Sequence, residues 1–249
     1  DKDNSTIRVR VVDKENNKTE PKLIICAEND VIKGFMLIQF QNYFSRFLDT
    51  FAKRAVIIGA PVFNGDEIVL SKLLEYYKNS FKKEVVYSQV RNIYCIDKYI
   101  ARFKNFGFKH TGHLNYLIDL NENIDTIWQN VHSKRKNEIR KGLKENITVS
   151  EINYEKESYP SYCLLKSVYS KAGLPLPDFS YFKSAGDIMT KDNVLKILGG
   201  YYNGILVSVI YLLCYRGRVY NWYAAGNHEY YRKYPNDVTM WEAVKWAKE

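Results

Sequence analysis

A run of basic residues near the middle of the chain is the segment best equipped to bind an anion. Residues 132–145 read HSKRKNEIRKGLKE, and the basic members are Lys134, Arg135, Lys136, Arg140, Lys141 and Lys144. At ~100° per residue on an α-helix, most of these side chains fall on one face. Such a face suits the phosphates of tRNA, of a nucleotide-linked precursor or of CoA. The alternative is a solvated surface that Glu138 and Glu145 partly neutralise.

Tyrosines gather near the end of the chain, where they alternate with basic residues. This second candidate segment holds Tyr220, Tyr223, Tyr230, Tyr231, Arg232, Lys233 and Tyr234. Aromatic rings among cations can stack on bases or sugars. The alternative is that tyrosine fills half-buried strand faces, as its strand propensity predicts. We expect a ligand-facing role for residues 230–234 in particular.

The remaining reactive side chains form no recognisable catalytic or metal site. His110 and His113 are three residues apart without a nearby third ligand, so we predict no metal. The cysteines are widely spaced, and each lies in an apolar or aromatic stretch: Cys26, Cys95, Cys163 and Cys214. They are typical of reduced thiols in a cytoplasmic protein. No Ser or Cys has a base at recognisable spacing, so the catalytic residue stays unknown.

The composition limits the number of domains and the kinds of partner that the chain can have. With 249 residues, 46% hydrophobic and 26% charged, the chain is long enough for one large domain or two small ones around a substantial core. The net charge of +9 favours an anionic partner. No apolar run reaches the ~18 residues of a membrane-spanning helix.

The elements that must position these segments occur twice in the same order. Residues 22–40 predict two strands around a turn at Asn29-Asp30, followed by a strand at 55–58, a helix at 66–81 and a strand at 84–90. Residues 194–226 repeat the three strands, with turns at Asn203-Gly204 and Arg216-Gly217. A helix over 239–248, capped by Asp237 or Thr239, follows. Between the repeats we expect helices at 125–145, 159–172 and 179–190. The repeat predicts two similar mixed α/β halves.

Several stretches in a fixed order resemble the FemABX-like family of peptidoglycan interpeptide-bridge aminoacyltransferases and their acyltransferase relatives. They are GAPVF at 59–63, VYSQVRN at 86–92, NFGFKHTGHLNYLIDL at 105–120, HSKRKNEIRKGLKE at 132–145, SKAGLPLPD at 170–178 and residues 226–249. The resemblance covers nearly the whole chain and rests on the order of modest motifs. It implies an α/β fold of two tandem GNAT-like (acyl-CoA N-acyltransferase-like) halves, each a mixed twisted sheet flanked by helices. We place them at 1–123 and 124–249, and expect both to be trimmed at the chain ends.

The resemblance also implies a site. Acyl transfer to an amine forms a tetrahedral oxyanion that needs hydrogen-bond donors, and in a GNAT-like half the third hairpin strand and the following helix start line the acyl-donor channel. The substrate-binding residues expected from this are Lys134, Arg135, Arg140, Tyr223, Asn227, Tyr234 and Asn236. The glycine-rich CoA pyrophosphate loop is replaced by RKYPNDVTM at 232–240, which disfavours CoA in this half.

The implied function is transfer of an acyl or aminoacyl group onto an amine of a cell-envelope precursor, in peptidoglycan or polysaccharide synthesis. The co-substrate is aminoacyl-tRNA or acyl-CoA, with no tightly bound cofactor. The expected partners are a precursor that bears phosphate groups and, if aminoacyl-tRNA is the donor, tRNA. The expected location is the cytoplasm, either free or bound peripherally to the inner face of the membrane. Two alternatives stay open: a non-catalytic module that binds RNA or another polyanion, and a CoA-dependent N-acetyltransferase.

Overall fold

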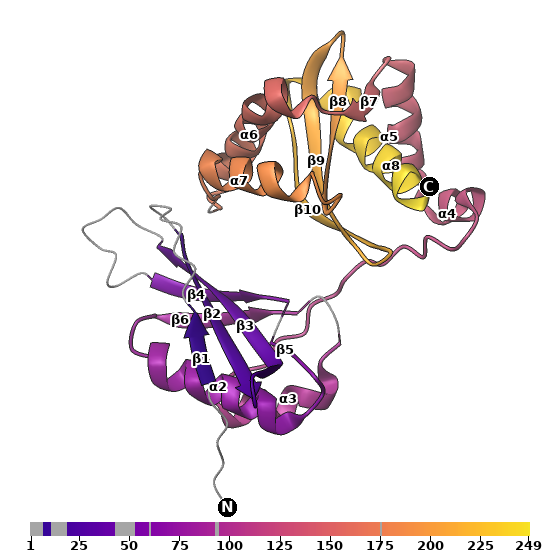
Figure 1. Ribbon diagram of the computed structural model, residues 1–249. Helices are drawn as coiled ribbons and strands as arrows, with labels where there is room; N and C mark the ends of the chain where they lie inside the picture. Colours follow the sequence, from indigo (N-terminus) through magenta and orange to yellow (C-terminus); the bar gives the residue numbers. More distant parts are fainter. Residues whose placement is uncertain (1–6, 11–18, 43–52, 60, 93–94, 175) are drawn as a thin grey trace, which may run out of the picture. The chain divides into compact units, whose positions relative to one another are not determined.

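The structure is a computed structural model that describes residues 7–10, 19–42, 53–59, 61–92, 95–174 and 176–249 (Figure 1). The chain divides into two compact units, residues 1–116 and 117–249. The predicted domain limits, 1–123 and 124–249, lie close to this division and stay a prediction. We describe each unit by itself.

The first unit is built on one mixed sheet. Its strands are β1 (Ile7–Arg10), β2 (Thr19–Glu28), β3 (Val31–Asn42), β4 (Lys53–Ile58), β5 (Val62–Phe63) and β6 (Tyr87–Arg91). The order is β1-β2-β3-β4-β6, with β5 paired to β3. All neighbours are antiparallel except β4 and β6, which run parallel because helix α2 connects them. Asn29 and Asp30 adopt positive φ in the turn between β2 and β3, which confirms the predicted hairpin.

Helices cover one face of this sheet. They are α2 (Glu67–Phe81), the 3₁₀ turn η1 (Asp97–Tyr99) and α3 (Ile100–Asn105). The Asp66 side chain caps α2 by accepting a hydrogen bond from the Ile68 backbone N–H at 2.8 Å. Leu73 and Tyr77 of α2 pack into a core with Ile24, Met36 and Ile38 of the sheet.

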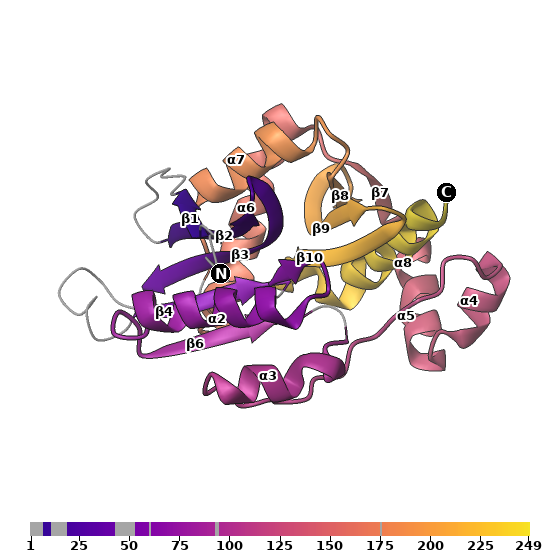
Figure 2. The same cartoon turned by 60° about the horizontal axis from the view of Figure 1, so that its bottom comes forward.

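The second unit places one antiparallel sheet between two helical layers (Figures 1 and 2). Its elements are α4 (Ile124–Asn130), α5 (Ser133–Lys144), β7 (Thr148–Glu151), α6 (Tyr154–Lys171), α7 (Phe179–Met189), β8 (Leu195–Tyr202), β9 (Ile205–Tyr215), β10 (Arg218–Gly226), η2 (His228–Lys233) and α8 (Pro235–Lys248). The sheet order is β10-β9-β8-β7. Helices α6 and α7 cover one face, and α8 covers the other with α5 packed beside it (Figure 1).

The two faces of this sheet are packed differently. The α6–α7 face is aromatic, with Phe182 of α7 at the centre and Tyr211 and Tyr223 of the sheet around it. The Tyr211 hydroxyl hydrogen-bonds Ser161 of α6 at 2.6 Å, and burial raises the pKa of Tyr211 to about 12. On the α8 face, buried Ser208 and Thr239 form a hydroxyl pair at 2.6 Å that joins β9 to α8.

The predicted α/β fold with two helix-flanked sheets is confirmed, and three helix predictions need correction. The helix expected over 125–145 is two helices, because the backbone at Val131 and His132 is extended and His132 begins α5 as its N-cap. The helix expected from Tyr159 begins at Tyr154, where Asn153 caps it. The last helix begins at Pro235, where proline suits the first turn, so the predicted caps Asp237 and Thr239 lie inside it.

Among the described residues, no helix combines the length and apolarity that crossing a lipid bilayer requires.

Candidate functional site

The candidate site lies where β10 ends and α8 begins. Asn227 follows β10 directly and caps η2, because its side-chain oxygen accepts from the Glu229 backbone N–H at 3.0 Å. Tyr234 then adopts a left-handed conformation with φ 56°, which turns the chain sharply into α8. Asn236, in the first turn of α8, packs its amide directly against Gly226. The structure therefore brings together three predicted site residues, Asn227, Tyr234 and Asn236.

Helix α5 packs tightly against this corner. Gly142 lets the helices approach, since a β-carbon there would lie 3.0 Å from the Lys233 carbonyl oxygen and against Val238. The Lys141 ammonium lies 5.8 Å from the centre of the Tyr234 ring. Lys233 of η2 pairs with Glu145 just beyond the end of α5, at 2.6 Å. The corner is thus held by α5 as well as by the sheet.

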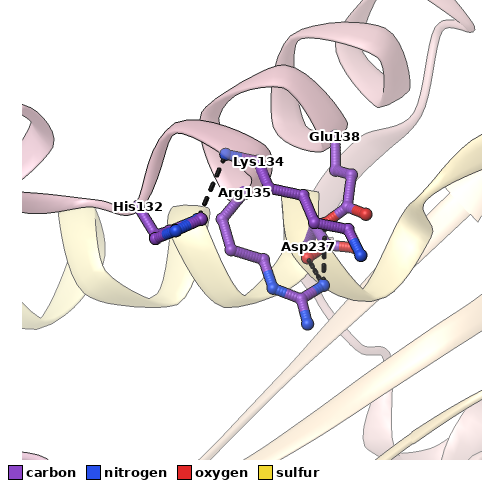
Figure 3. Close-up of polar contacts among 5 residues, drawn as sticks. All are labelled: His132, Lys134, Arg135, Glu138 and Asp237. Atoms are coloured by element: carbon purple, nitrogen blue, oxygen red, sulfur yellow. Dashed lines mark hydrogen bonds and ion pairs between the residues drawn. The ribbon is translucent and has the colours of Figure 1, made fainter.

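Arg135 connects α5 to the first turn of α8 through an ion pair (Figure 3). Its guanidinium donates to Asp237 at 2.9 Å and to Glu138 at 2.8 Å. One cation shared by two carboxylates leaves a formal charge of −1 on the three groups. Arg135, predicted as a phosphate anchor, is therefore occupied by the protein's own carboxylates. Sequence reasoning noted Asp237 only as a helix cap, because its partner lies 102 residues earlier.

Burial and Arg135 shift the pKa of Asp237 in opposite directions. Burial raises the pKa of Asp237, and the positive charge and hydrogen bond of Arg135 lower that pKa in part. A carboxyl whose pKa is higher in the folded protein than in the unfolded chain destabilises the fold when ionised, and this cost disappears as the pH falls below the folded pKa.

Replacing Arg135 by alanine is therefore expected to lower stability most near neutral pH. Without the guanidinium the pKa of Asp237 rises further, so the stability difference between Arg135→Ala and wild type should shrink as the pH is lowered from about 7 to about 4. Urea unfolding across this range measures that difference. Arg140→Ala is the matched control, because Arg140 contacts a ring instead of a carboxylate. A difference that does not vary with pH would contradict this role of Asp237.

The other two predicted basic residues lie elsewhere on α5. Arg140 places its guanidinium carbon 5.5 Å from the centre of the Trp128 ring, and Trp128 packs against Trp241 of α8 at 4.7 Å between ring centres. The Lys134 backbone N–H donates to His132, and its side chain is exposed (Figure 3). Arg140 and Lys134 are therefore exposed to solvent. Neither takes part in the ion pair between Arg135 and Asp237.

Tyr223 packs with the aromatic residues on the opposite face of the sheet from α8. Its ring centre lies 4.9 Å from that of Phe182 and 5.7 Å from that of Tyr169. The structure therefore does not bring the Tyr223 side chain to the start of α8. The backbone of β10 has a β-bulge just before Tyr223, where Trp222 is the extra residue in the pairing with β9.

The outer edge of β10 is a second source of hydrogen-bond donors. β9 pairs with one edge of β10, and no strand of the described residues pairs with the other edge. Backbone N–H groups along such an edge are unused by the sheet and can donate to an oxyanion. Within the same described ranges, no group of His, Cys, Asp and Glu side chains is suited to hold a metal ion.

Comparisons with known proteins identify the fold. Residues 167–249 match a family model described as an acetyltransferase (GNAT) domain. The crystal structure of FemX matches with a TM-score of 0.63 and 16% identity, over 93% of this chain and 77% of that one. The C-terminal domain of a protein described as a lysylphosphatidylglycerol synthetase from Agrobacterium fabrum matches with a TM-score of 0.56 and 9% identity, over 87% of this chain and 64% of that one. The search of curated proteins gives no match.

The acetyltransferase match implies acyl-CoA as a co-substrate and no tightly bound cofactor. The residues at the start of α8 do not fit the pyrophosphate of CoA, however. Instead of glycines that open the backbone to a phosphate, the turn has Tyr234 and Pro235, and the first helical turn has the Asp237 carboxylate. A pyrophosphate approaching α8 would meet a negative charge. An acyl-CoA would have to place its pyrophosphate elsewhere.

The matched domain begins within α6 and includes β8, β9, β10 and α8, the elements that form the candidate site. The first unit repeats the same order, a hairpin followed by a third strand and a helix, in β2, β3, β4 and α2. The predicted resemblance and fold are thereby confirmed: the chain is FemABX-like in fold, and residues 167–249 of its second unit match the acetyltransferase (GNAT) domain.

Proposed function

We propose that the protein transfers an activated aminoacyl or acyl group onto an amine of a cell-envelope precursor. One observation carries the proposal: the unit that matches the acetyltransferase family model presents the open edge of β10 next to the first turn of α8. The FemABX resemblance supports a peptidoglycan precursor as the acceptor, and the second structural neighbour is described as a synthetase that forms an aminoacylated lipid.

The reaction needs little covalent participation by the protein. The acceptor amine attacks the carbonyl carbon of the donor, a C–N bond forms, and the C–O or C–S bond to the leaving group breaks. The amine loses one proton and the leaving group gains one. Backbone N–H groups on the outer edge of β10 would stabilise the oxyanion, and the Asn236 amide, which lies against Gly226, would orient a substrate carbonyl. No side chain is assigned as the base.

The two substrates meet different charges at this site. Lys134 and Arg140 are exposed cations and remain the predicted anchors for phosphate groups of the acceptor. The shared charge of Arg135, Asp237 and Glu138 is negative, which disfavours a pyrophosphate and favours the ammonium group that an aminoacyl donor carries. We therefore expect aminoacyl-tRNA to be a better donor than acyl-CoA.

A transfer assay on the full-length protein tests this proposal. Lysyl-tRNA and alanyl-tRNA are compared with a panel of acyl-CoA thioesters, with a nucleotide-linked peptidoglycan precursor or glucosamine as the acceptor. We expect a new amide on the acceptor, formed faster from aminoacyl-tRNA. Faster transfer from acyl-CoA would contradict the donor preference and leave the acyltransferase reaction in place. RNA binding with steep salt dependence and no transfer from any donor would favour a binding module instead. The predicted cytoplasmic location stays a prediction.

A further inference from the structure

The solvent-facing side of α5 carries only basic and neutral side chains. Its members, which we call the α5 arc, are Ser133, Lys134, Asn137, Arg140, Lys141 and Lys144, all exposed. They cover ~120° of the helix surface at ~100° per residue. At 1.5 Å per residue, Lys134 and Lys144 are about 15 Å apart along the helix axis. The arc is therefore a continuous cationic strip on a convex surface.

The acidic residues that sequence analysis expected to neutralise α5 are paired with cations outside the arc. Glu138 pairs with Arg135 on the side that packs against α8. Glu145 pairs with Lys233 of η2. Both carboxylates are thus paired with cations outside the arc, and no ion pair is formed between them and the cations of the arc.

Exposed apolar and aromatic side chains occur on α5 and on η2. Leu143 is 46% exposed on the flank of α5, and Tyr231 of η2 is 54% exposed. The Arg232 guanidinium lies over the Tyr231 ring, 5.8 Å from its centre. Leucine and tyrosine among lysines and arginines are typical of helices that lie at a bilayer interface, where rings and apolar tips enter the headgroup region.

We propose that the α5 arc docks the protein onto an anionic lipid bilayer. Charge complementarity identifies the occupant, because the arc offers four exposed cations and the carboxylates that border it, Glu138 and Glu145, are paired with Arg135 and Lys233. A strip on one convex helix fits a flat surface, whereas single-stranded nucleic acids are usually bound in a groove with stacking rings. Docking goes beyond the proposed transfer reaction and needs no turnover, so the two can fail independently.

Vesicle co-sedimentation tests the docking. Wild-type protein should bind vesicles of phosphatidylcholine and phosphatidylglycerol in equal parts, bind pure phosphatidylcholine weakly, and dissociate as salt is added. Lys141→Glu with Lys144→Glu changes the charge of the arc by four units. At about 1 kcal/mol per charge near the surface, this variant should lower the partition coefficient at least about a hundredfold. Lys141→Gln with Lys144→Gln should lower it by roughly half as much on a logarithmic scale.

The matched control is Lys166→Glu with Lys171→Glu, which makes the same charge change on exposed positions of α6, across the sheet from α5 (Figure 1). Its partition coefficient should stay well above that of the α5 variant. Three results would overturn the proposal: an equal loss of vesicle binding in the α6 control, no loss of vesicle binding in the glutamine variant, or a wild-type protein that does not bind anionic vesicles. If the wild-type protein bound a short RNA duplex tightly at a salt concentration at which it did not bind vesicles, RNA would be the occupant instead.

Discussion

Gly200→Ala is expected to lower the free energy of unfolding of the second unit by about 3 kcal/mol. Gly200 lies in β8, and an added β-carbon would overlap the hydroxyls of Ser208 and Thr239. Those hydroxyls are buried and bonded to each other, so the strain would separate α8 from β9 or break the pair. Urea unfolding followed by tryptophan fluorescence measures the loss. The signal reports this unit alone, because Trp128, Trp222, Trp241 and Trp246 all lie in it.

A steric cause can be separated from a conformational one. Gly204→Ala is the control within the same unit, because a β-carbon there meets nothing within 4 Å but Gly204 has a φ of +76°. Only the modest cost of a strained turn, about 1 kcal/mol, is expected. If Gly200→Ala cost no more than Gly204→Ala, the tight docking of α8 on the sheet would be wrong.

Local chemistry explains why the strands and turns of the second unit were predictable. Asn203 and Gly204 tolerate positive φ, and the long apolar run after them can only be a buried strand. The turn registers alone would pair Gly200 and Gly226 with Val207, and a β-bulge in each hairpin shifts both pairings to Ser208. Sequence reasoning therefore places the end of β10 to within one residue, and the structure supplies the shift.

The charge pairing at the site could not be predicted in the same way. Arg135 was expected to bind phosphate because it lies in a basic run and because the FemABX resemblance favours it, but Asp237 reaches it only when α5 packs on α8. That packing depends on Gly142, whose missing side chain lets α5 approach η2 and α8. In sequence, Gly142 reads only as a weak point in a helix. A glycine in the middle of a basic helix was thus the available signal for a close helix contact.

The predicted helix boundaries were wrong where an extended backbone interrupts a helical pattern of apolar residues. Apolar residues recur at helical intervals from Ile127 to Leu143, yet Val131 and His132 are extended and the helix restarts. The restart sets which side of α5 is buried: Ile139 and Gly142 lie on that side, and Glu138 pairs with Arg135 at its edge. Which cations of α5 are exposed to solvent could therefore be learned only from the structure.

Gly226→Ala is expected to lower kcat/KM of the transfer reaction about a hundredfold while changing stability little. An added β-carbon would overlap the Asn236 amide, and because this side chain is exposed it can swing away at small cost. If the loss arises from that displacement, Asn236→Ala should cause a similar loss, and the double variant should be no worse than either single one. Asn130→Ala, another exposed amide, should keep wild-type rates. Additive losses would mean that Gly226 and Asn236 act separately, and wild-type rates in both single variants would exclude the start of α8 from the site.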